Sequence, residues 1–467
     1  MNRRITPFIF VLVSISMALF SCQKSSPEDY RAASANPEFI HSSMKELTDI
    51  IVHDIFSPPV ASRVYAYPSI AAYEALQNAY PDYKSLAGQL HGLKEIPAPD
   101  TSLEYVFPLS AVKALTTVGK ALVFSEDTMQ VYEEKVFRAY KEMGIPNKVF
   151  EQSLAYGDAV AQHILQWADQ DNYKQTRTYP KHSVGEDENT WKPTPPAYMD
   201  AIEPHWNKIR PFIIDSATQF VPEPPSPFEL SKNSNFYDEI MEVYEVTNNL
   251  SEEQAEIASF WDCNPYVMNV TGHVMFATKK ITPGGHWIGI TAIACRQAKA
   301  DMMESVEAYA QTSIALADAF ISCWDEKYRS NLIRPETVIN AHFDPEWQPL
   351  LQTPPFPEYT SGHSVISTAA ALALTDLFGE DFSFEDTTEV EYGLPPRSFD
   401  SFIDASAEAA VSRLYGGIHY RPAIDNGVSQ GRKVGAFVVE NLVTRREGVK
   451  GRGEELEPGR VSGAEQP

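Results

Sequence analysis

Apolar residues recur at helical spacing through most of this chain. The clearest run has steps of four, three, four and four residues: Ile40, Met44, Leu47, Ile51 and Ile55. This is the period of an amphipathic helix. The same period returns over residues 129–143 and 150–164, and strand-like alternation is scarce. The sequence therefore predicts an all-α fold.

Local signals predict where some helices begin and end. Gly144, followed by Pro146, is typical of a helix C-terminus, and Ser251 with Gln254 forms a capping box at a helix start. A long helical stretch is expected from Ile288 to about Ile333, divided into more than one helix.

Residues 169–235 break the helical pattern with many prolines, aromatic residues and charges. A segment of this length is either a connection between domains or a functional loop. We place the border between an N-terminal helical domain (38–210) and a C-terminal helical domain (211–445) within it. After Val443 the chain turns polar and glycine-rich, so we expect a disordered tail at 446–467.

The first residues have the pattern of an export signal. Two arginines precede an apolar run from Phe8 to Phe20, and Ser21-Cys22 follows. We predict a lipoprotein signal peptide (1–21), a lipid on Cys22 and a flexible tether (22–37), which places the protein on a bacterial cell envelope membrane, facing the periplasm or the cell surface. A plain secretory peptide with an incidental cysteine is the alternative.

The charge and the cysteines exclude several classes of protein. The net charge is −25, and it becomes −27 without residues 1–21. Nucleic-acid binders carry basic surfaces, so such a partner is excluded, and an anion site would need a local cluster of basic residues. Cys263, Cys295 and Cys323 allow at most one disulfide, and no Cys/His spacing indicates a zinc site.

Ser361, Gly362 and His363 form the first of three informative blocks. They lie where a proline-rich loop, PPFPEYT, meets an alanine-rich run that ends near Gly379. A helix that begins there presents unpaired backbone N–H groups and its positive dipole end to an oxyanion. The tripeptide alone also fits an ordinary cap and turn.

The second block is WDEKYRSNLIRP. Helical steps place four residues on one face: Trp324, Lys327, Asn331 and Arg334. On one continuous helix, Lys327 and Arg334 would lie about 10 Å apart along the axis. Pro335 disfavours a helical Arg334, so the arginine is expected near a terminus. The face is either a solvated stripe or one wall of an anion pocket.

The third block is SRLYGGIHYRPAIDNG. Arg413 closes a helical run from Phe402 to Leu414, and His419 follows after a glycine turn. Asp425 is a candidate to orient His419 by a hydrogen bond. Together the three blocks supply lysine, two arginines, serine, a glycine N–H and two histidines. That set suits a tetrahedral or trigonal-bipyramidal oxyanion.

The order Lys327-x6-Arg334-Pro335, Ser361-Gly362-His363 and Ser412-Arg413-x5-His419 resembles the signature shared by vanadium-dependent haloperoxidases and type 2 phosphatidic acid phosphatases. The resemblance covers roughly residues 324–425. Two positions depart from it: Thr360 stands where proline is usual, and Ala423 where the family's closing aspartate is usual. Asp425 is therefore a doubtful substitute.

The resemblance implies a role for each matching residue. Lys327, Arg334 and Arg413 would hold the anion's oxygens, and Ser361 with the Gly362 N–H would complete the cradle. His419 would be the ligand to vanadium or, in a phosphatase, the nucleophile. His363 would be the general acid and base. The implied architecture is two packed helical bundles of the vanadium haloperoxidase type.

Residues beside the anion site favour the peroxidase branch. Trp324 and Phe356 match positions that are aromatic in the chloroperoxidases, where they line the halide side, although both also fit core packing. No apolar stretch after residue 21 is long enough to span a membrane, which excludes the integral-membrane phosphatases. We expect a haloperoxidase that uses vanadate, hydrogen peroxide and halide to make hypohalous acid for a small organic acceptor. A secreted type 2 acid phosphatase is the alternative.

Overall fold

The structure, a computed structural model, describes residues 27–271 and 274–446. The helices of its first half are α1 (Pro27–Ser34), α2 (Glu38–His53), α3 (Pro58–Leu76), α4 (Phe107–Leu122), α5 (Glu126–Glu142), α6 (Asn147–Ala168) and α7 (Tyr173–Thr176). The second half contains α8 (Asn235–Asn248), α9 (Glu252–Phe260), α10 (Pro283–Gln297), α11 (Met302–Ser330), α12 (Pro335–His342), α13 (Gly362–Phe378), α14 (Phe402–Tyr415) and α15 (Arg421–Asn441). The all-α prediction is confirmed.

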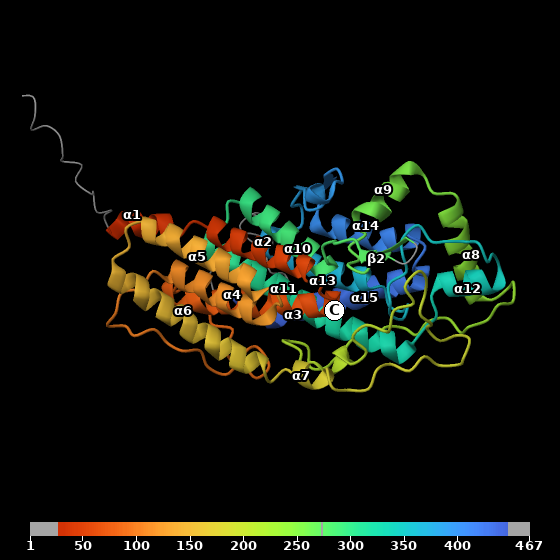
Figure 1. Cartoon of the computed structure of the whole chain (residues 1–467), viewed down its shortest axis with the longest axis horizontal. Helices are drawn as coiled ribbons and strands as arrows, with labels where there is room; N and C mark the ends of the chain where they lie inside the picture. Colours follow the sequence, from red (N-terminus) through yellow and green to blue (C-terminus); the bar gives the residue numbers. More distant parts are fainter. Residues whose placement is uncertain (1–26, 272–273, 447–467) are drawn as a thin grey trace, which may run out of the picture.

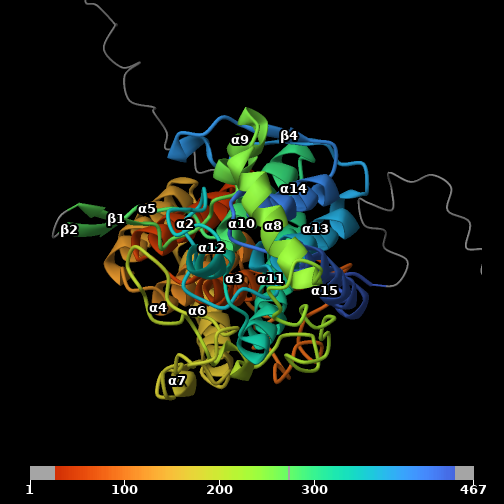
Figure 2. The same ribbon diagram turned by 90° about the vertical axis from the view of Figure 1, so that its right-hand side faces the viewer.

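Short elements complete the fold. Single 3-10 turns lie at η1 (Gln77–Ala79), η2 (Trp206–Lys208) and η3 (Val390–Tyr392). Two antiparallel hairpins, which the sequence pattern did not predict, pair β1 (Met268–Thr271) with β2 (Val274–Ala277) and β3 (Phe384–Asp386) with β4 (Arg397–Phe399). The β1–β2 hairpin projects from the side of the helical body (Figure 2).

The helices are arranged along one long axis. Figure 1 shows α4, α5 and α6 at one end and α8 and α12 at the other, with α3, α11 and α13 between them. Helix α11 runs through the middle, and almost every side chain from Met302 to Lys327 is buried. One apolar cluster includes Leu47 and Val112 of the first half with Phe320 and Ile366 of the second. The two predicted domains therefore share a core, and their border stays a prediction.

Helix α15 packs with its backbone against α13. Gly427, Gly431 and Gly435 recur at four-residue spacing, and a Cβ atom on Gly431 would lie 2.2 Å from the carbonyl oxygen of Val365. Only glycine allows so close an approach. The backbone N–H of Ser361 donates to the carbonyl of Ala423 at 3.0 Å, which ties the start of α13 to the start of α15.

Several expected element ends are confirmed. Helix α5 ends before Gly144, which has a φ of 84°, and the Ser251–Gln254 capping box starts α9. The expected break at residues 169–235 contains only α7 and η2 as helical elements before α8 begins at Asn235. The stretch that begins at Ile288 belongs to two helices, α10 and α11.

Two expectations need correction. Lys327 and Arg334 do not lie on one helix, because α11 ends at Ser330, Asn331 adopts a left-handed φ of 47°, and Arg334 caps the next helix. The expected tether is partly helical: Pro27–Ser34 form α1, and Tyr30 is buried and donates to Glu104 at 3.0 Å.

The expected signal peptide (1–21), the lipidated Cys22 and all but the first residue of the expected tail (446–467) lie outside the described residues. Within the described ranges, no helix combines the length and the apolar character that a membrane span requires.

Candidate active site

The start of α13 forms the floor of the site. Ser361 is the N-cap: its backbone is extended and its hydroxyl accepts from the backbone N–H of Ser364 at 3.4 Å. The first backbone N–H groups of α13 have no partner within the helix, so they are available to an anion. His363 occupies the first turn of the helix, beside Gly362.

Lys327 holds the loop that leads into α13. Its Nζ atom donates to the backbone carbonyls of Pro357, Glu358 and Thr360, at 3.1, 3.1 and 2.6 Å. Lys327 is fully buried, and burial lowers its pKa to about 8. Because three carbonyls take its three donors, Lys327 fixes the loop in addition to carrying positive charge.

Two buried guanidinium groups approach the site from different helices. Arg334 donates from Nε to the carbonyl of Phe356 at 3.0 Å and from Nη1 to the carbonyl of Ile418 at 2.8 Å. Arg413 donates from Nη1 to the carbonyl of Trp261 at 2.7 Å. Burial lowers the pKa of Arg334 to about 10 and also lowers that of Arg413, yet both remain cations at neutral pH.

Glu358 orients His419. The Nδ1 atom of His419 lies 2.8 Å from Oε1 of Glu358, which also accepts from the backbone N–H of Tyr420 at 3.0 Å. Nδ1 therefore carries the proton, and the lone pair of Nε2 faces the site, 3.2 Å from Nη1 of Arg334. Burial, with the charges of Arg334 and Lys327, holds the pKa of His419 well below its usual range.

Asp425, the candidate from the sequence, does not fill this position. It is on α15, where it lines a separate hollow with Arg421 and Arg432. Glu358 was overlooked because it lies 61 residues before His419, and no local spacing links the two. The sequence feature that could have identified Glu358 is its position in the PPFPEYT loop that leads into Ser361.

A small cavity of about 30 Å³ lies where these groups meet. Six predicted site residues line it: Trp324, Phe356, Gly362, His363, Arg413 and His419. Lys327, Arg334 and Ser361 lie behind this lining, all three fully buried. The rings of Trp324 and Phe356 are 5.0 Å apart, and Nζ of Lys327 lies 5.0 Å from the Phe356 centroid. The structure thus brings the predicted residues of the three blocks together, with the exception of Asp425.

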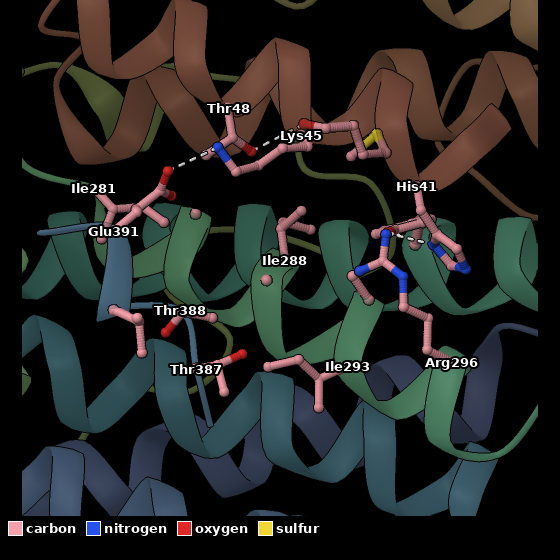
Figure 3. Close-up of a pocket in the computed structure, with 16 residues that line it drawn as sticks. His41, Lys45, Thr48, Ile281, Ile288, Ile293, Arg296, Thr387, Thr388 and Glu391 are labelled. Atoms are coloured by element: carbon pink, nitrogen blue, oxygen red, sulfur yellow. Dashed lines mark hydrogen bonds and ion pairs between the residues drawn. The ribbon is translucent and has the colours of Figure 1, made fainter. Parts of the chain in front are cut away.

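A larger cavity, about 490 Å³, lies elsewhere, between α2, α10 and residues 387–391 (Figure 3). Its polar groups are largely paired already: Lys45 contacts Glu391 at 3.0 Å, and His41 lies 2.8 Å from the Tyr309 hydroxyl. It shares no lining residue with the small cavity. Size alone therefore does not identify the chemical site.

Unpaired polar atoms show what the small cavity can hold. Nη2 of Arg334, Nε of Arg413 and Nε2 of His363 are buried without a hydrogen-bond partner in the described part of the chain. Buried polar atoms normally have partners, so these atoms indicate a ligand. Two guanidinium donors suit an oxyanion, and the Nε2 lone pair of His419 suits a metal or phosphorus centre.

Comparisons with known proteins agree with this geometry. The family model described as the VCPO second helical-bundle domain matches residues 307–448. The crystal structure of the first bacterial vanadium-dependent iodoperoxidase is 54% identical, with a TM-score of 0.85, over 89% of this chain and 99% of that chain. This chain belongs to the vanadium-dependent haloperoxidases.

More distant haloperoxidases share the fold. Holo-type and apo-type structures of a bacterial vanadium-dependent chloroperoxidase are 16% and 15% identical, with TM-scores of 0.63 and 0.62. Each covers 83% of this chain, and the chain covers 93% and 94% of theirs. The comparison with curated proteins gives no match.

The cofactor of this haloperoxidase is vanadate, and the donor set fits it. Vanadate is an oxyanion whose oxygens can accept from the unpaired N–H groups of Arg334 and Arg413, and its metal can accept the Nε2 lone pair of His419. A Cβ atom on Gly362 would point toward Trp324 and Lys327, at 3.8 and 4.0 Å, so glycine leaves room beside these side chains. The acid phosphatase alternative is not favoured.

Proposed function

We propose that this haloperoxidase oxidises iodide with hydrogen peroxide. The observation that carries the proposal is the 54% identity to a vanadium-dependent iodoperoxidase that the chain covers almost completely. The chloroperoxidases are too distant in sequence to support a choice of halide.

His419 is the ligand to vanadium through Nε2, since Glu358 keeps the proton on Nδ1. Arg334 and Arg413 bind the vanadate oxygens through their unpaired N–H groups. The backbone N–H of Gly362 and the hydroxyl of Ser361 complete the cradle at the start of α13. Lys327 supplies positive charge and holds the loop beneath the anion.

His363 moves the proton of hydrogen peroxide. Its Nε2 atom is unpaired, and its ring borders the cavity. Burial, with the charge of Arg413, holds its pKa well below the usual range, so the neutral ring can accept a proton across the neutral pH range. When bound, vanadate supplies a Lewis acid that polarises peroxide, and the vanadium does not change its oxidation state.

Trp324 and Phe356 form the apolar wall on the halide side of the cavity. The Phe356 ring lies against Lys327 and Arg334, 5.0 Å from Nζ and 5.2 Å from Cζ, and an apolar wall backed by two cations suits a large, weakly hydrated anion such as iodide. The cavity is too small for an organic molecule, so hypohalous acid leaves it and halogenates an acceptor outside.

Steady-state rates with iodide, bromide and chloride test the choice of halide. The vanadate-loaded protein is assayed at fixed peroxide, and kcat/KM is compared among the three halides. We expect iodide to exceed bromide and chloride by at least about a hundredfold, which corresponds to about 3 kcal/mol of transition-state discrimination. A chloride or bromide rate equal to the iodide rate would refute the iodide proposal while leaving the vanadate site intact.

We also propose that the chain is exported and held on a bacterial membrane by a lipid on Cys22. Support comes from the basic and apolar residues before Ser21-Cys22. In fractionated bacteria, the native chain should sediment with membranes and the Cys22→Ser variant should not. Equal distribution of the two proteins between the fractions would exclude the lipid anchor.

A further inference from the structure

Four ionisable side chains that the proposed mechanism does not use meet beside the active site. They come from three separate segments: Cys263 follows α9, His286 is on α10, and Asp386 and Glu389 lie in and after β3. All four are buried, with exposed fractions of 1%, 0%, 0% and 6%. Buried charges are costly unless they are paired or bind a metal.

The four side chains converge around His286. Its Nε2 atom lies 2.7 Å from Oδ2 of Asp386. Its Nδ1 atom lies 3.4 Å from Sγ of Cys263 and 3.2 Å from Oε1 of Glu389, and these last two atoms are 3.8 Å apart. Sulfur, nitrogen and oxygen thus form one triangle, with Asp386 behind the imidazole.

With a neutral His286, hydrogen bonding alone satisfies this triangle poorly. In a neutral His286, Nε2–H donates a hydrogen bond to Asp386. The Nδ1 lone pair then faces the carboxylate of Glu389. A single proton on Nδ1 or on the Cys263 thiol can bridge only one side of the triangle. A cation at its centre satisfies all three atoms together.

We propose that Cys263, His286 and Glu389 form a Zn²⁺ site. A tetrahedral Zn²⁺ with bonds of about 2.3 Å to sulfur and about 2.0–2.1 Å to nitrogen and oxygen holds its ligand atoms about 3.3–3.6 Å apart. The observed 3.4, 3.2 and 3.8 Å lie close to this range. A thiolate and an imidazole favour zinc over magnesium or calcium.

Asp386 has the position of a supporting carboxylate. Metal-binding histidines usually donate their other ring N–H to a carboxylate, which fixes the tautomer and the ring orientation. The 2.7 Å contact between Asp386 and Nε2 of His286 directs the Nδ1 lone pair at the triangle. Asp386 also accepts from the backbone N–H and the hydroxyl of Thr388, at 2.9 and 2.7 Å, so its own orientation is fixed.

The zinc site would brace the vanadate cavity. Cys263 lines that cavity, and the carbonyl of Trp261, two residues earlier, accepts from Arg413. The ring of His286 stacks on Trp261, with centroids 4.5 Å apart and planes 18° apart. Zinc would thereby hold the segment that orients Arg413. On its other side, Glu389 belongs to the segment whose Thr387, Thr388 and Glu391 line the cavity of Figure 3.

A protonated His286 is the competing explanation for the cluster. Burial lowers the pKa of His286, but the charges of Asp386 and Cys263 and their hydrogen bonds to the ring together outweigh it and raise the pKa well above its usual range. An imidazolium between Asp386 and Glu389 would leave the Cys263 thiol protonated and the site without metal.

Metal analysis separates the two explanations without using activity. The vanadate-free protein is incubated with Zn²⁺, freed of excess by gel filtration, and analysed for zinc and protein. We expect stoichiometric zinc in the native chain and in Cys295→Ala, which removes another buried cysteine from α10. In Cys263→Ala, the zinc retained per protein should fall by at least about tenfold. Negligible zinc in the native chain, or equal losses in both variants, would overturn the proposal.

Cobalt substitution keeps the test valid if Cys263→Ala does not fold. Co²⁺ bound to a cysteine thiolate gives a near-ultraviolet charge-transfer band, and tetrahedral coordination gives intense visible bands. The native protein loaded with Co²⁺ should show both, and Glu389→Gln, which keeps the thiol and the imidazole, should bind Co²⁺ more weakly. Bound cobalt without the thiolate band would mean that the metal lies elsewhere and would refute the site.

Discussion

Nδ1 of His419 donates to Glu358 at 2.8 Å, and this contact determines which ring nitrogen faces the vanadate cavity. The same carboxylate oxygen accepts from the backbone N–H of Tyr420, so Glu358 connects the loop before α13 to the turn before α15. The orientation of the metal ligand therefore depends on a residue of the loop before Ser361 to which the sequence pattern assigned no role.

Replacing Glu358 tests this dependence. Glu358→Met removes the acceptor at similar volume, and we expect vanadate affinity to fall about 10–100-fold because the tautomer of His419 is no longer fixed. Glu358→Gln should recover most of the affinity, since the amide oxygen can also accept from Nδ1. Calorimetric titration with vanadate measures both variants. Asp425→Asn is the control and should bind like the native protein; native affinity in Glu358→Met would contradict the account.

Vanadate affinity should depend on the protonation of Lys327. Burial lowers the pKa of Lys327 to about 8 in the anion-free protein, so its ammonium charge is present below that pH and lost above it. We expect binding to weaken as pH rises through about 8. The Lys327→Arg variant keeps its charge over this range, so it lacks this titration and retains those of vanadate and of Glu358, whose pKa burial raises to about 8. Identical pH profiles for the two proteins would show that Lys327 does not titrate there.

His363 should affect turnover more than binding. His363→Ala removes the proton acceptor, and we expect kcat for iodide oxidation to fall about 10²–10⁴-fold. The dissociation constant for vanadate should rise only moderately, because the arginines and His419 remain. His53→Ala removes a largely exposed histidine at the end of α2 and is the control. Unchanged turnover in His363→Ala would refute its assignment.

The contact between α13 and α15 should be sensitive to a single methyl group. In Gly431→Ala the Cβ atom would lie 2.2 Å from the carbonyl oxygen of Val365, so the helices must separate. We expect a loss of about 1–3 kcal/mol in the free energy of unfolding, measured with denaturant. Gly284→Ala on α10 is the matched control, because its Cβ meets nothing closer than 3.8 Å. Equal stability of the two variants would mean that the contact between α13 and α15 is not tightly packed.

Much of the fold could be predicted from sequence because its signals are local. The helical run that starts at Ile40 corresponds to α2, although Ile55 lies beyond the end of that helix with a φ of 55°, and the capping box at Ser251 starts α9. The three blocks could be joined into one site only through their resemblance to a family. Their local context could not show that Asn331 ends α11 in a left-handed conformation and separates Lys327 from Arg334.

The remaining features depend on contacts between distant segments. Glu358 meets His419 across 61 residues, and Cys263 meets His286 and Glu389 across 23 and 126 residues. No spacing rule connects such positions, which is why the sequence showed neither the orienting carboxylate nor the zinc ligands. Short strands such as Phe384–Asp386 were missed because three residues cannot display an alternating pattern.

A paired assay on protein stripped of vanadate distinguishes haloperoxidase activity from phosphatase activity. Oxidation of iodide by hydrogen peroxide and hydrolysis of an aryl phosphate are measured on the same preparation, with and without added vanadate. Iodide oxidation should occur only with vanadate and should saturate at stoichiometric cofactor, and phosphate hydrolysis should be negligible. Phosphate hydrolysis that vanadate inhibits, with no halide oxidation, would contradict the haloperoxidase assignment and show that the cradle of Arg334, Arg413 and His419 serves phosphoryl transfer.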